Sequence, residues 1–515
     1  MTKDPTSELA NEPATTVVDD FEPAGRPPAE HAFFGHPRGL ATLFFTEFWE
    51  RFSYYGMRGL LFLFMVTAAA EGGLGFSEGR AGAVYGLYVA GVYLLALPGG
   101  WLADRLFGQQ RAIFIGGCII AAGHFSMAIP TLGTFYLGLV LIVMGTGLLK
   151  PNISAIVGEL YPEGGARRDA GFSIFYMGIN LGAFVAPLVC GALGEKVDWH
   201  LGFGAAGVGM VFGLIQYAYG KKYLGEAGLL QPSGLAGVEE ERRKRRIYAI
   251  LGGGFVAVVA LAGGARLLGI SIEDVANGAL VLILSAAILF FGYVLLAGGL
   301  DGTEKKRVGA FAILFLFSVL FWMGFEQAGG SMNVFALELT DRDVFGWQMP
   351  ASWLQSVNPL FIILLAPVFG ALWVALSKRS LNPSIPLKFA AGLVLLGLGF
   401  FALVYGARAA EAGVLVSPWW LILAYLLHTS GELCLSPVGL SMTTKLAPKR
   451  FASQMMGVWF LSLSLGNLSA GIVSGQIETL PMADLFFWVF AVTAGGGALL
   501  LLLSRPVNRL TGGIK

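Results

Sequence analysis

A row of polar side chains interrupts a long apolar segment near the start of the chain, FFTEFWERFSYYGMRGLLFLFMV. Their offsets of 0, 3, 4, 7, 8 and 11 residues would place all of them on one face of a helix. A charged side chain at bilayer depth costs at least about 2.5–3.5 kcal/mol, so four charges on one face predict a polar protein interior rather than lipid. The row consists of Glu47, Glu50, Arg51, Tyr54, Tyr55 and Arg58.

Three members of this row can respond to protons. Glu50 and Arg51 are adjacent, and Glu47 lies one helical turn from both. A carboxylate beside a cation stays ionised, and it can accept a proton when the cation turns to a substrate instead. We therefore predict a proton-coupling device here, with a static ion-pair cluster that only fixes helix packing as the alternative.

Further charges lie in later apolar segments, where each needs a partner. Lys150 and Glu432 lie at similar distances from the starts of two segments that would run in the same direction. Arg58 and Glu326 lie in two segments that would run the other way. Two pairs that join the halves of the chain can form and break alternately, or they can be permanent contacts that hold the halves together.

The polar and aromatic side chains of these segments suit a zwitterionic ligand. Arg51 and Lys150 would attract a carboxylate, and Glu432 would attract an ammonium group. Aromatic rings tolerate varied side chains and asparagine amides can bond a peptide backbone, although a single aromatic residue is more often lipid-facing or packed between helices. The other candidate ligand contacts are Tyr54, Tyr55, Tyr93, Asn180, Trp322, Asn358, Ser436 and Trp459.

The composition indicates that membrane-spanning helices position these side chains. Of 515 residues 56% are hydrophobic and 13% charged, whereas a soluble domain has about 25% charged residues. The chain is therefore expected to be an all-α polytopic membrane protein, and a net charge of +1 gives no reason to expect nucleic acid as a partner. Apolar windows predict about fourteen spans, at 39–66, 80–106, 111–130, 133–158, 168–193, 200–222, 247–266, 276–298, 308–336, 352–376, 386–407, 416–445, 452–478 and 483–505.

Lysine and arginine clusters occupy alternate connections between the expected spans. By the positive-inside rule these connections and both termini face the cytoplasm, in a multi-pass protein of the cell (inner) membrane. The clusters lie at 105–111, 167–168, 221–222, 242–246, 305–307, 378–379 and 445–450.

Composition shifts divide the chain into five regions. Residues 1–38 are polar and are predicted to form a disordered cytoplasmic tail. Residues 225–246 are predicted to be a basic cytoplasmic linker, solvated rather than bound to anionic headgroups. A six-helix bundle (39–224) precedes this linker, and two inserted transmembrane helices (247–300), expected beside the transport path, and a second six-helix bundle (301–515) follow it.

The segment GGWLADRLFGQQR at 99–111 resembles the signature loop of the major facilitator superfamily. Asp104 can accept a hydrogen bond from a helix N-terminus or an arginine, and Gly100 and Gly108 permit close backbone approach. The alternative is a generic loop with a local ion pair. The resemblance implies the two-bundle major facilitator fold, in which Asp104 and Arg105 help to close the inner face.

Several motifs together resemble the proton-dependent oligopeptide transporters (POT/PTR) of that superfamily, of the bacterial type with two extra helices. The first-helix row matches the ExxERFxYYG signature, and the resemblance runs from about residue 39 to the C-terminus. Further matching segments are GTGLLKPNIS (145–154), FSIFYMGINLGAF (172–184), FWMGFEQAGGSMNVFA (321–336) and GELCLSPVGLSMTTKLAP (431–448).

This resemblance implies a proton-coupled symporter that imports di- and tripeptides by alternating access and functions as a monomer. It implies that the candidate ligand contacts line the peptide site. Lys150 with Glu432 would gate the inner side, and Arg58 with Glu326 the outer side. Apart from the proton as coupling ion, no cofactor and no metal is implied.

Two other functions remain to be weighed. A carrier of the same family could move another solute, such as nitrate or a peptide-like compound; however, Glu432 would repel nitrate, and some nitrate carriers of the family lack the ExxER motif that is intact here. An intramembrane enzyme needs a nucleophile–base dyad, a metal cluster or paired catalytic carboxylates. Five histidines and no HExxH motif argue against an enzyme.

Overall fold

Long apolar helices make up nearly all of the fold. The computed structural model describes residues 33–231 and 237–512, and in these ranges twelve helices are long and apolar enough to cross a membrane. Two further long helices, α1 and α3, complete a set that corresponds one to one with the expected spans. The predicted fold class is therefore confirmed, whereas the predicted disordered tail lies almost entirely outside the described residues.

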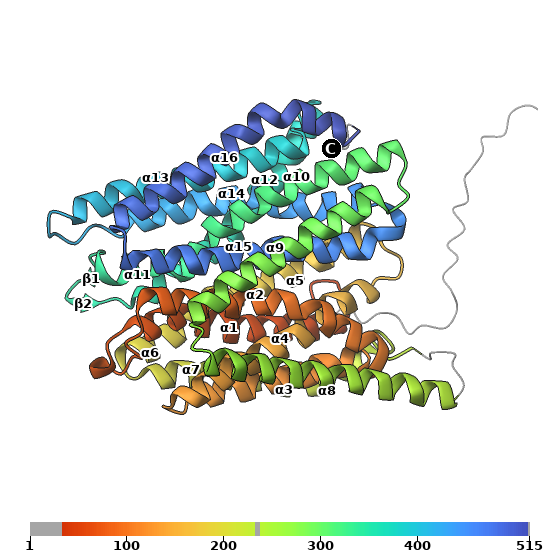
Figure 1. Cartoon of the computed structure of the whole chain (residues 1–515), viewed down its shortest axis with the longest axis horizontal. Coiled ribbons are helices and arrows are strands. Elements are labelled where there is room, and N and C mark those ends of the chain that lie inside the picture. The colour runs from red at the N-terminus through yellow and green to blue at the C-terminus, as the bar shows by residue number, and fades with distance from the viewer. Residues whose placement is uncertain (1–32, 232–236, 513–515) are drawn as a thin grey trace, which may run out of the picture.

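The helices of the first half pack on one another, and so do those of the second half (Figure 1). The two groups meet where α2 contacts α15 and where α5 contacts α12. The first group consists of α1 (Arg38–Val66), α2 (Glu78–Leu102), α3 (Gln109–Met127), α4 (Leu132–Glu159), α5 (Gly165–Ala186), α6 (Ala192–Lys196) and α7 (Trp199–Gly220). The second consists of α10 (Gly302–Phe325), α11 (Ser331–Glu338), α12 (Val357–Lys378), α13 (Ile385–Ala410), α14 (Trp419–Leu446), α15 (Ala452–Ser474) and α16 (Met482–Leu510).

Two of the expected spans are broken. After α5 a π-helical turn (Pro187–Gly191) leads into the short helix α6, and after α10 a 3₁₀ turn (Glu326–Gly329) leads into α11. Both breaks lie near the helix ends that are farthest from the lysine and arginine clusters. We call that side of the protein the opposite side, and we call the side that carries the clusters the basic side. An antiparallel hairpin of β1 (Asp343–Val344) and β2 (Trp347–Gln348) follows α11 on the opposite side.

The inserted helices are α8 (Gly237–Leu267) and α9 (Ile272–Leu296). α9 packs against α2, α10 and α15, and so contacts both groups of helices. α8 begins well before the expected residue 247, because the three glutamates at 239–241 and the basic run 242–246 are helical. Most described residues of the linker are exposed, and its start is held by Gln110, whose Nε2 donates to the carbonyls of Gly225 and Ala227 at 3.1 and 2.6 Å.

The loop motif forms a π turn (Ala103–Phe107) on the basic side, with Asp104 and Arg105 both exposed. Gly108 behaves as expected: its φ is +73°, and a Cβ there would lie 2.6 Å from the Leu230 nitrogen. Gly100 does not, since a Cβ would meet nothing closer than 3.8 Å. The Arg105 carbonyl accepts from Arg243 Nη2 of α8 at 3.2 Å, so the motif contacts an inserted helix.

Glycines let α2 and α15 cross at backbone contact. A Cβ added to Gly471 would lie 2.3 Å from the Gly82 carbonyl oxygen, an atom that no side-chain rotation can move. Such close approach by small residues is typical of helix pairs in membranes. At this crossing the two groups of helices contact each other directly through their backbones.

We expect Gly471→Ala to destabilise the protein by about 1–3 kcal/mol, because the methyl group must push two backbones apart. The measurement is the thermal unfolding midpoint of the purified protein in detergent. Gly292→Ala in α9 is the matched control, since a Cβ there meets nothing within 4 Å. Equal midpoints for the two variants would contradict the assignment of this contact.

Candidate functional site

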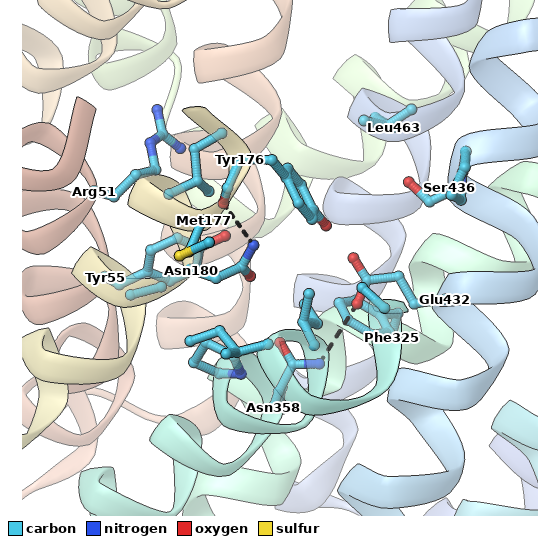
Figure 2. Close-up of a pocket in the computed structure, with 18 of the residues that line it drawn as sticks. Arg51, Tyr55, Tyr176, Met177, Asn180, Phe325, Asn358, Glu432, Ser436 and Leu463 are labelled. Atoms are coloured by element: carbon cyan, nitrogen blue, oxygen red, sulfur yellow. Dashed lines mark hydrogen bonds between the residues drawn. The ribbon is translucent and has the colours of Figure 1, made fainter. Parts of the chain in front are cut away.

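A cavity of about 830 Å³ lies between the two groups of helices (Figure 2). This volume is in the range of small-molecule sites. Its lining comes from α1, α2, α4, α5, α10, α12, α14 and α15. Ser154, Ser173 and Leu440 extend the lining toward the basic side, whereas the opposite end is closed by polar contacts.

The proton-coupling candidates form one buried cluster on α1. Arg51 Nε lies 3.0 Å from Glu47 Oε1 and 2.5 Å from Glu50 Oε2. Glu47 and Arg51 line the cavity, whereas Glu50 lies behind them and is fully buried. One guanidinium therefore contacts two carboxylates, only one of which a ligand in the cavity can reach.

The two tyrosines of the row have different surroundings. Tyr55 lines the cavity (Figure 2). Tyr54 does not; its ring stacks on that of Tyr88 at 6.4 Å, and the Arg51 guanidinium lies 5.3 Å from its centroid. Tyr54 thus supports Arg51 from the side away from the cavity.

The Lys150 ammonium reaches the cavity from α4 and lies 4.3 Å from the centroid of the Tyr93 ring. A ring face stabilises a cation by about 2 kcal/mol or more where water is excluded. In the part of the chain that the structure describes, Lys150 forms no ion pair with Glu432. The inner pair of the predicted gates is therefore apart.

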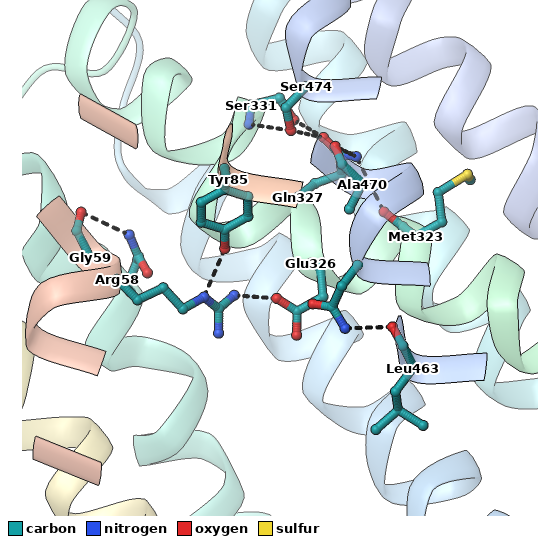
Figure 3. Close-up of polar contacts among 12 residues, drawn as sticks. Arg58, Gly59, Tyr85, Met323, Glu326, Gln327, Ser331, Leu463, Ala470 and Ser474 are labelled. Atoms are coloured by element: carbon teal, nitrogen blue, oxygen red, sulfur yellow. Dashed lines mark hydrogen bonds and ion pairs between the residues drawn. The ribbon is translucent and has the colours of Figure 1, made fainter. Parts of the chain in front are cut away.

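The outer pair is formed. Arg58 Nη2 lies 2.5 Å from Glu326 Oε2, and Arg58 Nε donates to the Tyr85 hydroxyl at 2.8 Å (Figure 3). Both charged side chains are at least nine-tenths buried. This pair joins α1 to the break after α10, and it bounds the cavity on the opposite side.

A polar network holds the break that presents Glu326. Gln327 Nε2 donates to the Ala470 carbonyl at 3.1 Å, and the Ser331 and Ser474 hydroxyls donate to Gln327 Oε1 at 2.6 and 2.8 Å (Figure 3). Asn333 Nδ2 donates to the Gly59 carbonyl at 2.9 Å. Since Gly59 follows Arg58, the network and the ion pair close the same end of the cavity.

Glu432 of α14 lies across the cavity from the cluster on α1 (Figure 2). Asn358 Nδ2 donates to the Thr429 hydroxyl at 2.9 Å and lies 3.5 Å from Glu432 Oε2. Asn180 Nδ2 donates to the Tyr176 carbonyl at 2.9 Å on the α5 side. Within the described residues Glu432 has no ion-pair partner, so a cationic group in the cavity would compensate it.

The structure brings together most residues predicted from the sequence. All four gating residues and all but one of the candidate ligand contacts line the cavity, the exception being Tyr54. The sequence analysis missed many other lining residues, among them Tyr176, Met177, Phe325, Gln355 and Leu463. Tyr176 could have been predicted, because it lies one helical turn before Asn180 in the fifth-helix motif and therefore on the same helix face.

Comparisons with known proteins show which family of proteins this chain resembles in sequence and in fold. A family profile described as "PTR2: POT family" matches residues 110–239 and 281–489. The peptide transporter YePEPT of Yersinia enterocolitica is 42% identical over 498 residues, covering 94% of this chain and 97% of the relative. The di-/tripeptide transporter of Lactococcus lactis subsp. cremoris is 38% identical over 502 residues, covering 94% and 99%. A crystal structure of a peptide transporter POT in complex with sulfate superimposes with a TM-score of 0.85 at 45% identity, covering 93% of this chain and 96% of that one.

We expect Arg58→Gln to lower the free energy of unfolding by about 3–5 kcal/mol, because it leaves the Glu326 carboxylate buried without a cation. The double variant Arg58→Gln/Glu326→Gln should recover much of this loss. Thermal midpoints in detergent provide the comparison.

The matched control removes an exposed charge pair. Arg167 Nη1 lies 4.0 Å from Glu163 Oε1 with both side chains about half exposed, so Arg167→Gln should cost about 1 kcal/mol or less. An Arg58→Gln midpoint equal to that of the control would contradict a tight buried pair.

Proposed function

The chain belongs to the POT family, so it is a multi-pass membrane transporter rather than an enzyme, and we propose that it imports di- and tripeptides together with protons. The observation that carries this proposal is the opposed charge across the cavity. Arg51 and Lys150 come from the first group of helices and Glu432 from the second. A peptide with a free carboxylate and a free ammonium group is complementary to both ends.

The walls between the charged ends suit variable peptides. Tyr55, Tyr93 and Trp322 offer ring faces, and Asn180 and Asn358 offer amides that can bond a peptide group. The relatives named above, a peptide transporter and a di-/tripeptide transporter, support the same substrate class.

Proton coupling is assigned to Glu47, Glu50 and Arg51. Arg51 contacts both carboxylates in the structure. When a substrate carboxylate takes over the guanidinium, the two acids lose part of their counter-charge, and one of them binds a proton. The proton and the peptide thus enter together, and the positive charge of the proton balances the negative charge of the peptide carboxylate.

Alternating access uses the two predicted gates. Arg58 and Glu326 are paired while Lys150 and Glu432 are apart, which supports a cavity closed on the opposite side and accessible from the basic side. By the positive-inside rule the basic side and both termini face the cytoplasm. The helices of one chain surround the cavity, so we propose that the monomer is the transport unit.

Nitrate is the weaker candidate solute within the family. Glu432 would place an uncompensated negative charge beside a bound anion, which favours substrates with an ammonium group. Peptide-like compounds that keep both charged ends fit the same cavity.

An inward proton gradient should drive accumulation of labelled dialanine in proteoliposomes, and external acidification should increase the uptake. Glu50→Gln should abolish the accumulation, because the neutral amide cannot take up a proton, while exchange of dialanine across the membrane continues. Glu163→Gln, an exposed acid outside the cavity, is the control. Uptake that ignores the external pH would contradict proton coupling.

Glu432→Gln should weaken inhibition by dialanine about 10–100-fold, because a hydrogen bond to a charged group is worth about 1.5–3 kcal/mol. Inhibition by N-acetyl-dialanine, which has no ammonium group, should change little. Competition for labelled substrate in exchange assays measures both peptides. Equal losses for the two peptides would exclude Glu432 as the ammonium site.

A further inference from the structure

A second contact between the two groups of helices lies on the opposite side, beyond the cavity. Glu195 of α6 accepts three hydrogen bonds from the residues that precede α12. Its Oε2 accepts from the Ala351 amide at 2.6 Å, and its Oε1 accepts from the Ser352 amide at 2.9 Å and the Ser352 hydroxyl at 2.6 Å. We call these contacts the Glu195 clasp.

The clasp is buried although it lies near the end of the bundle. The Glu195 side chain is 6% exposed, and Ser352 is fully buried. Hydrogen bonds to an ionised acceptor are roughly twice as strong as neutral ones. Separation without a replacement acceptor would leave three buried donors unsatisfied.

The break after α5 supplies further acceptors to the same segment. The Phe184 carbonyl in the last turn of α5 accepts from the Ser356 hydroxyl at 2.8 Å. The Leu188 carbonyl accepts from Trp353 Nε1 at 3.1 Å. Gly191 permits the approach, since a Cβ there would lie 2.1 Å from the Ser352 hydroxyl oxygen.

The partner segment is itself held in place. Arg342 Nη1 donates to the Met349 carbonyl at 2.7 Å, and Nη2 donates to the Leu337 carbonyl at 3.2 Å. The same guanidinium lies 3.9 Å from Glu195 Oε2. The loop that carries the β hairpin therefore presents its donors and one cation to Glu195 as a fixed unit.

We propose that the Glu195 clasp is a gating contact, separate from the Arg58–Glu326 pair, that holds the opposite side closed and must separate when that side opens. The proposal rests on the alternating access of the proposed function. Glu195 is not among the residues that line the cavity, so its role is in positioning the two groups of helices and not in binding the solute.

The test measures the distance between spin labels on the opposite side by double electron–electron resonance in nanodiscs. Ile129→Cys and Val414→Cys carry the labels, because both side chains are exposed and they belong to different groups of helices. Cys118, which is exposed, is first replaced by serine. Glu195→Gln should raise the ratio of long to short distances about tenfold, equivalent to about 1.4 kcal/mol.

Glu411→Gln is the matched control, because Glu411 is an exposed acid on the same side and its substitution should leave the distances unchanged. Ser352→Ala removes one donor and keeps both amides, so it should shift the ratio in the same direction by about threefold. If Glu195→Gln fails to fold, the distances measured in Ser352→Ala alone test the proposal. Distances like those of the control in either folded variant would overturn the proposal.

The result does not depend on the solute, because the distances are measured without peptide and without a proton gradient. An opened clasp together with absent dialanine uptake by the unmodified protein would count against the proposed substrate only. Normal uptake together with unchanged distances in Glu195→Gln would count against the clasp only.

Discussion

The need to compensate charge inside a bilayer determines the rest of this structure. Each of the four charges in the polar row of α1 has a partner at hydrogen-bond distance, and those partners lie on α1 itself or in the other group of helices. Arg51 shares its own helix with both acids, so its contacts persist whichever way the two groups move. Arg58 instead depends on Glu326, so its compensation depends on how the groups are arranged. The same energetic cost thus accounts for the proposed proton-coupling cluster in one case and for the proposed gate in the other.

Helix breaks allow these contacts to form. On the opposite side the helical pattern changes to a π turn after α5 and to a 3₁₀ turn after α10, each followed by a short α-helix. One break presents Glu326 to Arg58, and the other provides carbonyls and Glu195 to the segment before α12. Closure on this side therefore combines main-chain and side-chain contacts. The basic side has a different chemistry, because Lys150 is stabilised by an aromatic ring and Glu432 by an amide.

The sequence predicted the spans and the charged residues of the cavity because both follow from local rules. A charge within the bilayer costs free energy wherever it lies, so the sequence alone indicates that Glu47, Arg51 and Lys150 face a polar interior. The same reasoning applies to Glu432. A helical stripe, however, is wider than the cavity it faces, and periodicity alone could not separate Tyr55, which lines the cavity, from Tyr54, which packs behind it. The contacts of Glu195 were not predicted, because its donors are two backbone amides and a serine hydroxyl, which carry no charge that would mark them in the sequence.

The two closing contacts of the opposite side differ in what can release them. Arg58 and Glu326 border the cavity, so a bound solute or proton can alter their balance directly. The Glu195 clasp has no contact with the cavity and can respond only to movement of the helices that carry it. Glu195 lies on α6, which follows α5 and its π turn, and its donors lie directly before α12. The helices α5 and α12 also carry Asn180 and Asn358 into the cavity. A solute held between those two amides would pull on the same pair of helices that the clasp joins, which couples occupancy of the cavity to closure of the opposite side.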